Sequence, residues 1–490
     1  MKTALALAAL AIAFPAPAQK AALSPAELEA AKAITPALLK SHIRFLSSDL
    51  LEGRGPATRG DALTQAYLVS ELEGMGLVPG APGGGWIQKV PLVGIKRTSE
   101  TPATFASATG AASGTLGDDF VAVSGVQKPE VKLDGAEIVF AGYGIEAPEY
   151  GWNDFKDVDV RGKVVLVMNN DPETDPKLFA GKTRLWYGRW DYKYLMAARK
   201  GAAGAIIIHT TPSAGYGWQV IQTSWAGEQF ELSDDGSPRV LAKMWAREDL
   251  AKKLAELGGK NLDTLRAAAE KRDFRPVPLG VKVSIALTSA VTQKESGNVI
   301  GLLPGSDPKR SGEAVIYTAH HDHLGIREGA KPGADAIYNG ALDNASGVAA
   351  MLAVAKAFTR LPKAPARSTY FAFVAAEEQG LLGSELLAKN PPVPAGRIAA
   401  NVNVDGIGWF GKTAEFVNIG LGKSSLDEPL KAIAAFQGRR LEGDQFPDKG
   451  TFYRSDQFSF AKVGVPAAYL KKGTDAIGKP AGFGKEQQAA

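Results

Sequence analysis

The pattern of apolar and polar positions divides the chain into three segments. Residues 25–80 carry apolar positions at helical spacing, after a Ser24-Pro25 pair that is typical of a helix start. From about 96 to 285, short β-like runs are separated by turns. From about 295, strand, loop and helix alternate. This alternation predicts an α/β fold: a mostly parallel (mixed) central sheet flanked by helices, with a β-rich α/β domain inserted ahead of it.

The expected domain boundaries follow from these changes in the apolar pattern. We predict the N-terminal part of the main domain at 19–95, an inserted domain at 96–285 and the rest of the main domain at 286–490. The expected strands are Trp86–Val93, Glu137–Ala141, Lys163–Met168, Ala205–His209, Ala314–Ala319, Thr369–Ala376, Ala399–Val404 and Ala467–Leu470. The expected helices include Tyr192–Lys200 and Ser346–Phe358.

The N-terminus has its own pattern. Lys2 precedes an apolar run over residues 4–14 and the triplet Ala16-Pro17-Ala18, which together resemble a secretory signal with its cleavage site. We therefore expect residues 1–18 to be a signal peptide and the mature protein to be secreted or periplasmic in a bacterium; a buried N-terminal helix is the alternative. No later run has the roughly 18 apolar residues of a membrane span, so no stable membrane insertion is expected.

Composition narrows the chemistry. The formal charge is +4, from 56 Lys and Arg against 52 Asp and Glu, which gives no electrostatic reason to expect nucleic acid as a partner. There are no cysteines, so thiolate metal sites and cysteine nucleophiles are excluded. The composition leaves the oligomeric state open.

Residues of metal-ligand type follow several of the expected strands. His320 follows the first strand of the main segment, Glu377 and Glu378 follow the next, and Asp405 follows the third. Asp343 stands in a loop just before the Ser346 helix. The carboxyl ends of parallel strands share one sheet edge, so these side chains can converge. Clustered acids at such an edge require cations.

The ligand types indicate the metal. Imidazole with carboxylate oxygens suits zinc, with manganese or cobalt as substitutes. A carboxylate such as Asp343 can bridge two metals about 3.5–4 Å apart. Neighbouring residues on an extended segment point different ways, so one of Glu377 and Glu378 can bind metal while the other acts as general base. Asp322 is placed to accept the ring proton of His320, and His321 and His323 are expected to orient their neighbours.

Four sequence blocks resemble, in order, those of the co-catalytic di-zinc aminopeptidase family, which also includes glutamate carboxypeptidase-like enzymes. The blocks are 319–325 (AHHDHLG), 341–347 (ALDNASG), 376–380 (AEEQG) and 403–406 (NVDG). Segment 48–54 (SDLLEGR) resembles the family's N-terminal part, and 140–144, 159–163 and 197–208 resemble an inserted protease-associated domain. The resemblance implies a zinc-peptidase type of fold and a peptide substrate.

The resemblance also implies roles. His320 and Asp405 would hold one zinc and Glu378 the other, with Asp343 bridging and Glu377 as general base. The family's second zinc takes a further histidine near the C-terminal end, and this sequence has no histidine after His323. We expect either a fragment that ends before that ligand, or a genuine loss that weakens the second metal.

The expected function is a secreted zinc exopeptidase, with aminopeptidase favoured by the resemblance. The alternatives are a carboxypeptidase or dipeptidase, a glutaminyl-cyclase-like enzyme, and a catalytically impaired or non-enzymatic binding homologue. Residues 406–413 (GIGWFGKT) match a phosphate-binding loop, but a strand, not a helix, is expected after them. Nucleotide binding is therefore not predicted.

Overall fold

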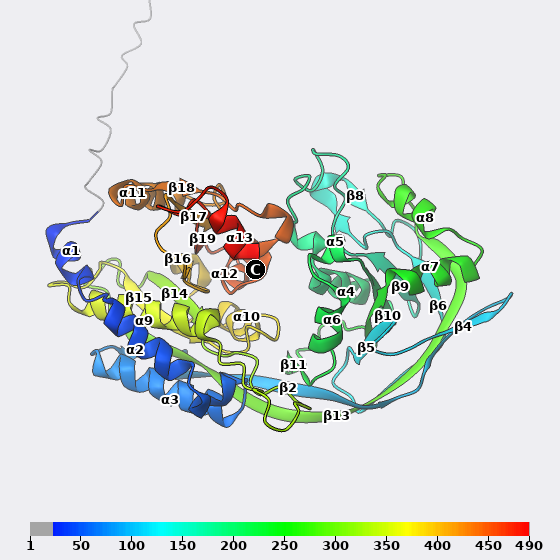
Figure 1. Ribbon diagram of the computed structural model, residues 1–490, viewed down its shortest axis with the longest axis horizontal. Helices are drawn as coiled ribbons and strands as arrows, with labels where there is room; N and C mark the ends of the chain where they lie inside the picture. Colours follow the sequence, from blue (N-terminus) through cyan, green and yellow to red (C-terminus); the bar gives the residue numbers. More distant parts are fainter. Residues whose placement is uncertain (1–22, 490) are drawn as a thin grey trace, which may run out of the picture.

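The computed structural model describes residues 23–489, and the expected signal peptide at 1–18 lies outside them. Two lobes lie side by side and share two long strands, β2 (Ile87–Glu100) and β13 (Val277–Leu303), which run along both (Figure 1). β2 pairs antiparallel with residues 287–299 of β13, and residues 277–288 of β13 pair with strands of the second lobe. The first lobe holds the residues that the sequence analysis expects to bind metal and is called here, after that expectation, the catalytic lobe. The second holds most of residues 103–277 and is called the insertion lobe.

Three helices begin the described chain and cover one face of the catalytic lobe: α1 (Pro25–Ala31), α2 (Pro36–Leu46) and α3 (Arg59–Gly74). Ser24 caps α1, where its side chain accepts from the backbone of Glu27 and the Glu27 carboxylate accepts in return, as the Ser-Pro start predicts. Both α2 and α3 pack beside α9 (Ser346–Thr359).

The sheet of the catalytic lobe runs in the order β2-β13-β15-β14-β16-β19-β17-β18. The strands not yet placed are β14 (Ala314–His320), β15 (Ser368–Val374), β16 (Ile398–Asn403), β17 (Glu415–Ile419), β18 (Arg440–Glu442) and β19 (Ala467–Lys472). Its centre, β15-β14-β16-β19, is parallel, so these four strands end at one edge. The α/β fold with a mostly parallel, mixed sheet is confirmed.

The insertion lobe has a separate hydrophobic core of residues between Ala103 and Leu287. Its centre is the parallel run β6-β9-β10-β12, covered by α4 and α7. The bounds are β3 (Ala103–Ser107), β5 (Phe120–Ser124), β6 (Glu130–Phe140), β9 (Val164–Met168), α4 (Trp190–Arg199), β10 (Gly204–His209), β12 (Ala242–Arg247), α7 (Glu248–Leu257) and α8 (Leu262–Ala269).

The predicted domain boundaries, 95/96 and 285/286, fall within β2 and β13. Both strands continue from one lobe into the other, so no break in secondary structure marks either boundary. These boundaries, like the protease-associated character of the insertion, stay predictions.

Shorter elements complete the described chain. They are β1 (Val78–Pro79), β4 (Ala111–Gly114), β7 (Glu146–Ala147), β8 (Trp152–Asn153), α5 (Thr211–Ala214), α6 (Trp218–Ser224), β11 (Gln229–Leu232), α10 (Leu382–Lys389), α11 (Asp427–Phe436), α12 (Gln457–Lys462) and α13 (Phe483–Ala489). Among residues 23–489, none of the helices combines the length and apolar character that crossing a bilayer requires.

The lobes also meet away from the shared strands. The backbone N–H of Arg184 donates to the carbonyl of Pro447 at 3.0 Å, and the rings of Trp186 and Phe458 lie 5.7 Å apart. Segment 444–458 therefore joins the insertion lobe to the edge where the parallel strands end.

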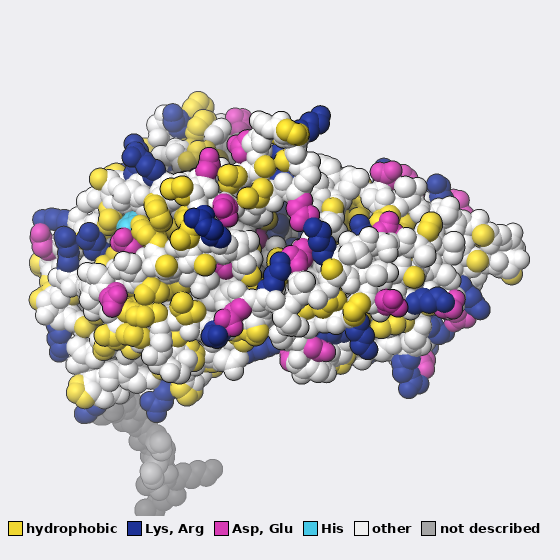
Figure 2. Space-filling view, turned by 90° about the horizontal axis from the view of Figure 1, so that it is seen from below, with side chains coloured by type: hydrophobic (Ala, Val, Ile, Leu, Met, Phe, Trp, Pro, Cys, Tyr) yellow, Lys and Arg dark blue, Asp and Glu magenta, His cyan; other side chains and the backbone are white. Residues whose placement is uncertain are grey.

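The face of the molecule seen in Figure 2 carries acidic and basic side chains intermixed.

Candidate metal centre

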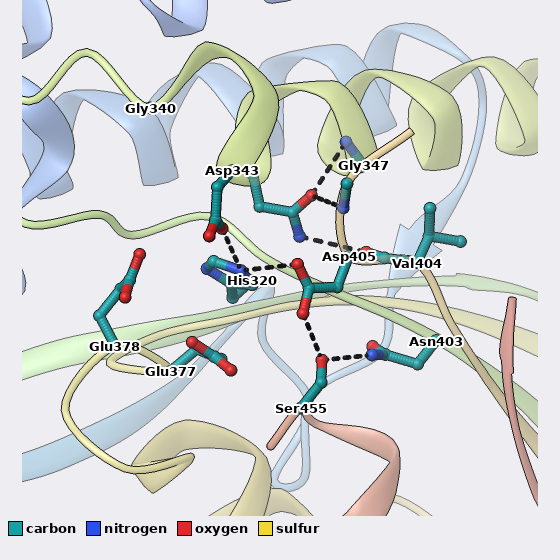
Figure 3. A network of polar contacts seen from close by, with 12 residues as sticks. His320, Gly340, Asp343, Gly347, Glu377, Glu378, Asn403, Val404, Asp405 and Ser455 are labelled. Atoms are coloured by element: carbon teal, nitrogen blue, oxygen red, sulfur yellow. Dashed lines mark hydrogen bonds and ion pairs between the residues drawn. The ribbon is translucent and has the colours of Figure 1, made fainter. Parts of the chain in front are cut away.

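His320 is the last residue of β14, and its buried imidazole lies between two carboxylates (Figure 3). Its Nε2 lies 3.1 Å from Oδ1 of Asp343 and 3.6 Å from Oδ1 of Asp405. On the other side of the ring, Nδ1 lies 3.2 Å from the backbone carbonyl of Asp322, to which we assign the ring proton. That assignment leaves the Nε2 lone pair facing the two carboxylates.

This arrangement fits a metal ion. Nε2 of His320 is buried and has no hydrogen-bond partner among the described residues 23–489. Two ligands that share one tetrahedral zinc at about 2.0–2.1 Å lie roughly 3.3 Å apart. The observed separations of 3.1 and 3.6 Å bracket this value. His320, Asp343 and Asp405 therefore form a ligand set of the size and shape that zinc needs.

Asp343 reaches the cluster from the turn before α9. Gly340 begins that turn at a φ of +58°, where a Cβ would meet Arg54 Nη2, the Asp343 carbonyl and the His323 ring within 2.5–2.7 Å. No side chain fits there, so the turn requires glycine. The side chain of Arg54, almost fully buried, donates to the carbonyls of Asn339 and Gly340 at 2.8 and 2.9 Å. The turn that presents Asp343 is thus fixed from behind.

Arg54 also links this turn to the strand that carries His320. Its Nε donates to the carbonyl of His321 at 2.8 Å, and Nη1 donates to that of Leu46. Burial lowers the pKa of Arg54 to about 10, against the raising effect of nearby carboxylates, Asp322 first, so the guanidinium stays charged at neutral pH. Segment 48–54, singled out in the sequence only by resemblance, therefore supplies a buried cation behind the cluster.

Asp405 follows β16 and is fixed by its neighbours. Its Oδ2 accepts hydrogen bonds from Ser455 at 2.7 Å and from the Tyr469 hydroxyl at 3.0 Å. Oδ1 is left to face His320. Ser455 belongs to the segment that joins the insertion lobe, so that segment also positions a candidate ligand.

Glu377 and Glu378 enter the cluster from the segment after β15 (Figure 3). His320 and both glutamates offer ligand atoms within 4.8 Å of one another. The carboxylate of Asp322 accepts from the backbone N–H of Glu377 at 3.1 Å and of Glu378 at 3.4 Å. The same carboxylate, expected to take the His320 ring proton, lies 3.8 Å from Nδ1, and the backbone carbonyl of Asp322 is the nearer acceptor at 3.2 Å.

His323 has a more direct place in the centre than the sequence indicated. Its Nδ1 lies 2.6 Å from Oε1 of Glu378, and His323, Asp343 and Glu378 form a further group with ligand atoms within 4.8 Å. The 2.6 Å separation is a hydrogen-bond distance, shorter than the roughly 3.3 Å between two ligands of one tetrahedral zinc. His323 therefore orients the Glu378 carboxylate through a direct hydrogen bond.

The electrostatics of the cluster favour positive charge. Burial would lower the pKa of His320, but the carboxylates around it, Glu377 first, hold that pKa well above its ordinary value. Burial raises the pKa of Glu377 well above its ordinary value, and Asp405 and Asp456 add to the effect. The acidic groups of this cluster outnumber the cations beside them, and a divalent metal ion would balance their charge.

The remaining histidines lie outside the ligand sets. His321 Nε2 lies 2.9 Å from Oδ1 of Asp61, which belongs to α3, and both side chains are buried. This contact fixes the segment after β14 against α3. His42 contacts the Tyr67 hydroxyl at 2.6 Å, and His209 contacts the Tyr216 carbonyl at 3.1 Å.

Sequence reasoning missed the supporting residues Arg54, Asp61, Ser455, Asp456 and Tyr469. Asp456 is fully buried, neither carboxylate oxygen has a hydrogen-bond partner among residues 23–489, and burial raises its pKa to about 7. The resembling segment 48–54 contained Arg54, but nothing in its spacing marked that side chain.

Comparisons with known proteins relate part of the chain to a peptidase family. Residues 298–485 match Peptidase family M28. Over 126 residues the chain is 32% identical to a vacuolar membrane protease of Yarrowia lipolytica. The matched region is 26% of this chain and only 11% of the length of that protease.

Solved structures resemble the fold over nearly the whole chain. An aminopeptidase from Aneurinibacillus sp. strain AM-1 is 20% identical with a TM-score of 0.52, over 92% of this chain and 88% of that one. BSAP, a zinc aminopeptidase from Bacillus subtilis, is 17% identical with a TM-score of 0.44, over 91% and 87%. The first likeness supports the shared fold. The match of residues 298–485 to Peptidase family M28 agrees with the zinc-peptidase resemblance of the four sequence blocks, all of which lie within those residues.

Proposed function

We propose that the chain is a zinc-dependent aminopeptidase, secreted or periplasmic, that removes N-terminal residues from peptides. The observation that carries the proposal is the convergence of His320, Asp343 and Asp405, with Glu377 beside them, at the edge where the parallel strands end. The printed names of the structural relatives favour the aminopeptidase. The resemblance of residues 1–18 to a signal peptide favours export.

Two zinc ions fit the residues present. His320 and Asp405 would hold the first and Glu378 the second, with Asp343 between them. When bound, zinc polarises the scissile carbonyl and lowers the pKa of a water molecule. His323 would keep one oxygen of Glu378 oriented toward the second ion through its hydrogen bond to the other.

Glu377 acts as general base in this proposal. Its half-buried carboxylate groups with His320 and Glu378 but has no place in the His320-Asp343-Asp405 set. It takes a proton from the attacking water and returns it to the departing amine nitrogen. The Asp322 carboxylate holds the backbone of Glu377 and Glu378 through two hydrogen bonds, so the base and the neighbouring ligand keep a fixed relation.

A carboxypeptidase, a dipeptidase or a glutaminyl-cyclase-like enzyme would use the same metal centre, and substrate choice separates them. Hydrolysis of leucyl-p-nitroanilide requires a free amine and no carboxylate, so it reports aminopeptidase activity alone. If the purified protein binds zinc but cleaves no aminoacyl-p-nitroanilide, it is not an aminopeptidase.

Glu377→Gln tests the mechanism. We expect kcat to fall about 10³-fold, or about 4 kcal/mol in barrier, with unchanged zinc content, because the amide cannot accept the proton. Glu385→Gln is the matched control: Glu385 lies on α10 and pairs with Lys389 at 2.8 Å, outside the ligand sets. Equal losses in both variants would remove Glu377 from the role of base.

A further inference from the structure

A cavity opens directly beside the metal centre, and its lining differs from the centre in charge. Its volume is about 310 Å³, and Asp343 and Asp405 are among the residues that line it. Trp409, Phe410 and Phe446 provide aromatic wall. A substrate whose scissile carbonyl lies at the centre therefore places a neighbouring group in this cavity.

Lys449, Lys471 and Lys472 also line the cavity. None of them forms a salt bridge or donates a hydrogen bond to any of residues 23–489, whereas many other lysines of the chain pair with carboxylates. Each ammonium lies over an aromatic ring instead. Lys472 Nζ is 3.9 Å from the ring centre of Phe410, Lys471 Nζ is 5.0 Å from that of Tyr469, and Lys449 Nζ is 5.1 Å from that of Phe446.

The charge balance of the lining favours an anion. The one acid that lines the cavity apart from the candidate ligands is Asp444. One of its oxygens already accepts the backbone N–H of Phe446 at 2.9 Å. Three ammonium groups against one partly engaged carboxylate leave cationic donors free, and a carboxylate is the anion that a peptide brings to such a place.

We propose that this cavity binds a carboxylate of the substrate, with Lys471 and Lys472 as its donors and the aromatic wall against the attached carbon chain. The inference rests on the proposed peptidase function and specifies its substrate class. The carboxylate has two possible sources, an acidic side chain next to the scissile bond or the C-terminus of a very short peptide. Lys471 lies over the Tyr469 ring, whose hydroxyl donates to Asp405, so the anion site adjoins a candidate ligand.

Matched substrate pairs distinguish the two sources. Glutamyl- and glutaminyl-p-nitroanilide differ only in a side-chain carboxylate, while Leu-Gly and Leu-Gly amide differ only at the terminus. We expect the wild type to prefer the carboxylate member of one pair about tenfold in kcat/KM. Lys471→Met and Lys472→Met should each reduce that ratio at least fivefold. Lys479→Met is the control, because Lys479 also lies over a ring, 5.3 Å from that of Phe483, but does not line the cavity.

Calorimetry with glutarate, compared with neutral glutaramide, gives a readout that needs no turnover. Glutarate should bind the zinc-loaded wild type and Lys479→Met alike, and at least tenfold more weakly to Lys471→Met and Lys472→Met. Glutarate held by the metal alone would bind all four proteins equally, and that result, or substrate ratios within twofold of wild type in both lysine variants, would overturn the proposal. Absence of any hydrolysis would count against the peptidase function, and the glutarate result alone would then decide whether the cavity binds a carboxylate.

Discussion

Both lobes bury charged side chains, but they compensate the charge in different ways. In the insertion lobe the fully buried Lys193 lies near Asp154 and Asp171, and its Nζ donates to the carbonyls of Tyr143 and Asn170 at 2.6 and 2.7 Å. Asp154 accepts three hydrogen bonds of 2.9–3.1 Å from its surroundings. A lysine and several hydrogen bonds from within the lobe thus compensate these buried acids, while burial lowers the pKa of Lys193 to about 7.

The catalytic lobe has no such closure. His320 Nε2 and both oxygens of Asp456 lack hydrogen-bond partners among residues 23–489, and the acids around them outnumber the cations. Burial of uncompensated charge is costly, so the two lobes differ in what they require from outside. The insertion lobe carries its own counter-charge, whereas the proposed zinc ions would supply it in the catalytic lobe.

Metal removal should give the largest difference between the two lobes. At free zinc 1,000-fold above the dissociation constant, binding stabilises the folded state by about 4 kcal/mol. Chelation should therefore abolish activity and raise hydrogen exchange in β14 and β15, while exchange in β10 of the insertion lobe stays the same. Equal loosening of β10 would show that the metal supports the whole molecule and not the catalytic lobe alone.

The next largest effect is expected from removing the internal cation of the insertion lobe. Lys193→Met takes the donor from two buried carbonyls and leaves Asp154 and Asp171 without their cation, so unfolding should become easier by about 3 kcal/mol. Urea unfolding measures this, and zinc content should not change.

Lys200→Met provides the control for that variant. Lys200 pairs with Glu146 at 2.8 Å, and its side chain is 27% exposed. Its loss should cost at most about 1 kcal/mol, as for a partly exposed ion pair. If both variants lose the same stability, the buried lysine does not compensate the two aspartates in the way its contacts indicate.

The sequence predicted the strands of the catalytic lobe well because they are apolar runs that end on unusual residues. His320 lies at the end of β14, and Glu377 and Asp405 follow β15 and β16 within a few residues, as expected. The extent of β2 and β13 was not predictable. Residues 277–290 of β13 alternate between more exposed and buried positions, residues 291–295 are partly or fully exposed and residues 296–301 are buried throughout, so no single pattern runs along the strand.

Side-chain pairings between distant segments could not be predicted from the sequence either. Arg54 meets the turn before Asp343 across 286 positions in sequence, and the partner of His323 lies 55 positions away. Strand ends can be located from local pattern, but which imidazole nitrogen faces which carboxylate depends on packing. For the same reason the sequence could not show that the backbone carbonyl of Asp322 lies nearer to His320 than its carboxylate does.

His323 gives the finest test of the comparison, because it decides whether the second half of the centre depends on an orienting hydrogen bond. Replacing it with glutamine removes the imidazole that lies 2.6 Å from Glu378 Oε1 and leaves the His320 set intact. Loss of such a partner lowers metal affinity about 10- to 100-fold. Competition with a chelator should show the weaker zinc released earlier and the tighter zinc unchanged. His209→Gln, in the insertion lobe, should leave both affinities as they are. A complete loss of one zinc equivalent would make His323 a ligand, and two unchanged affinities would leave it without a role in the centre.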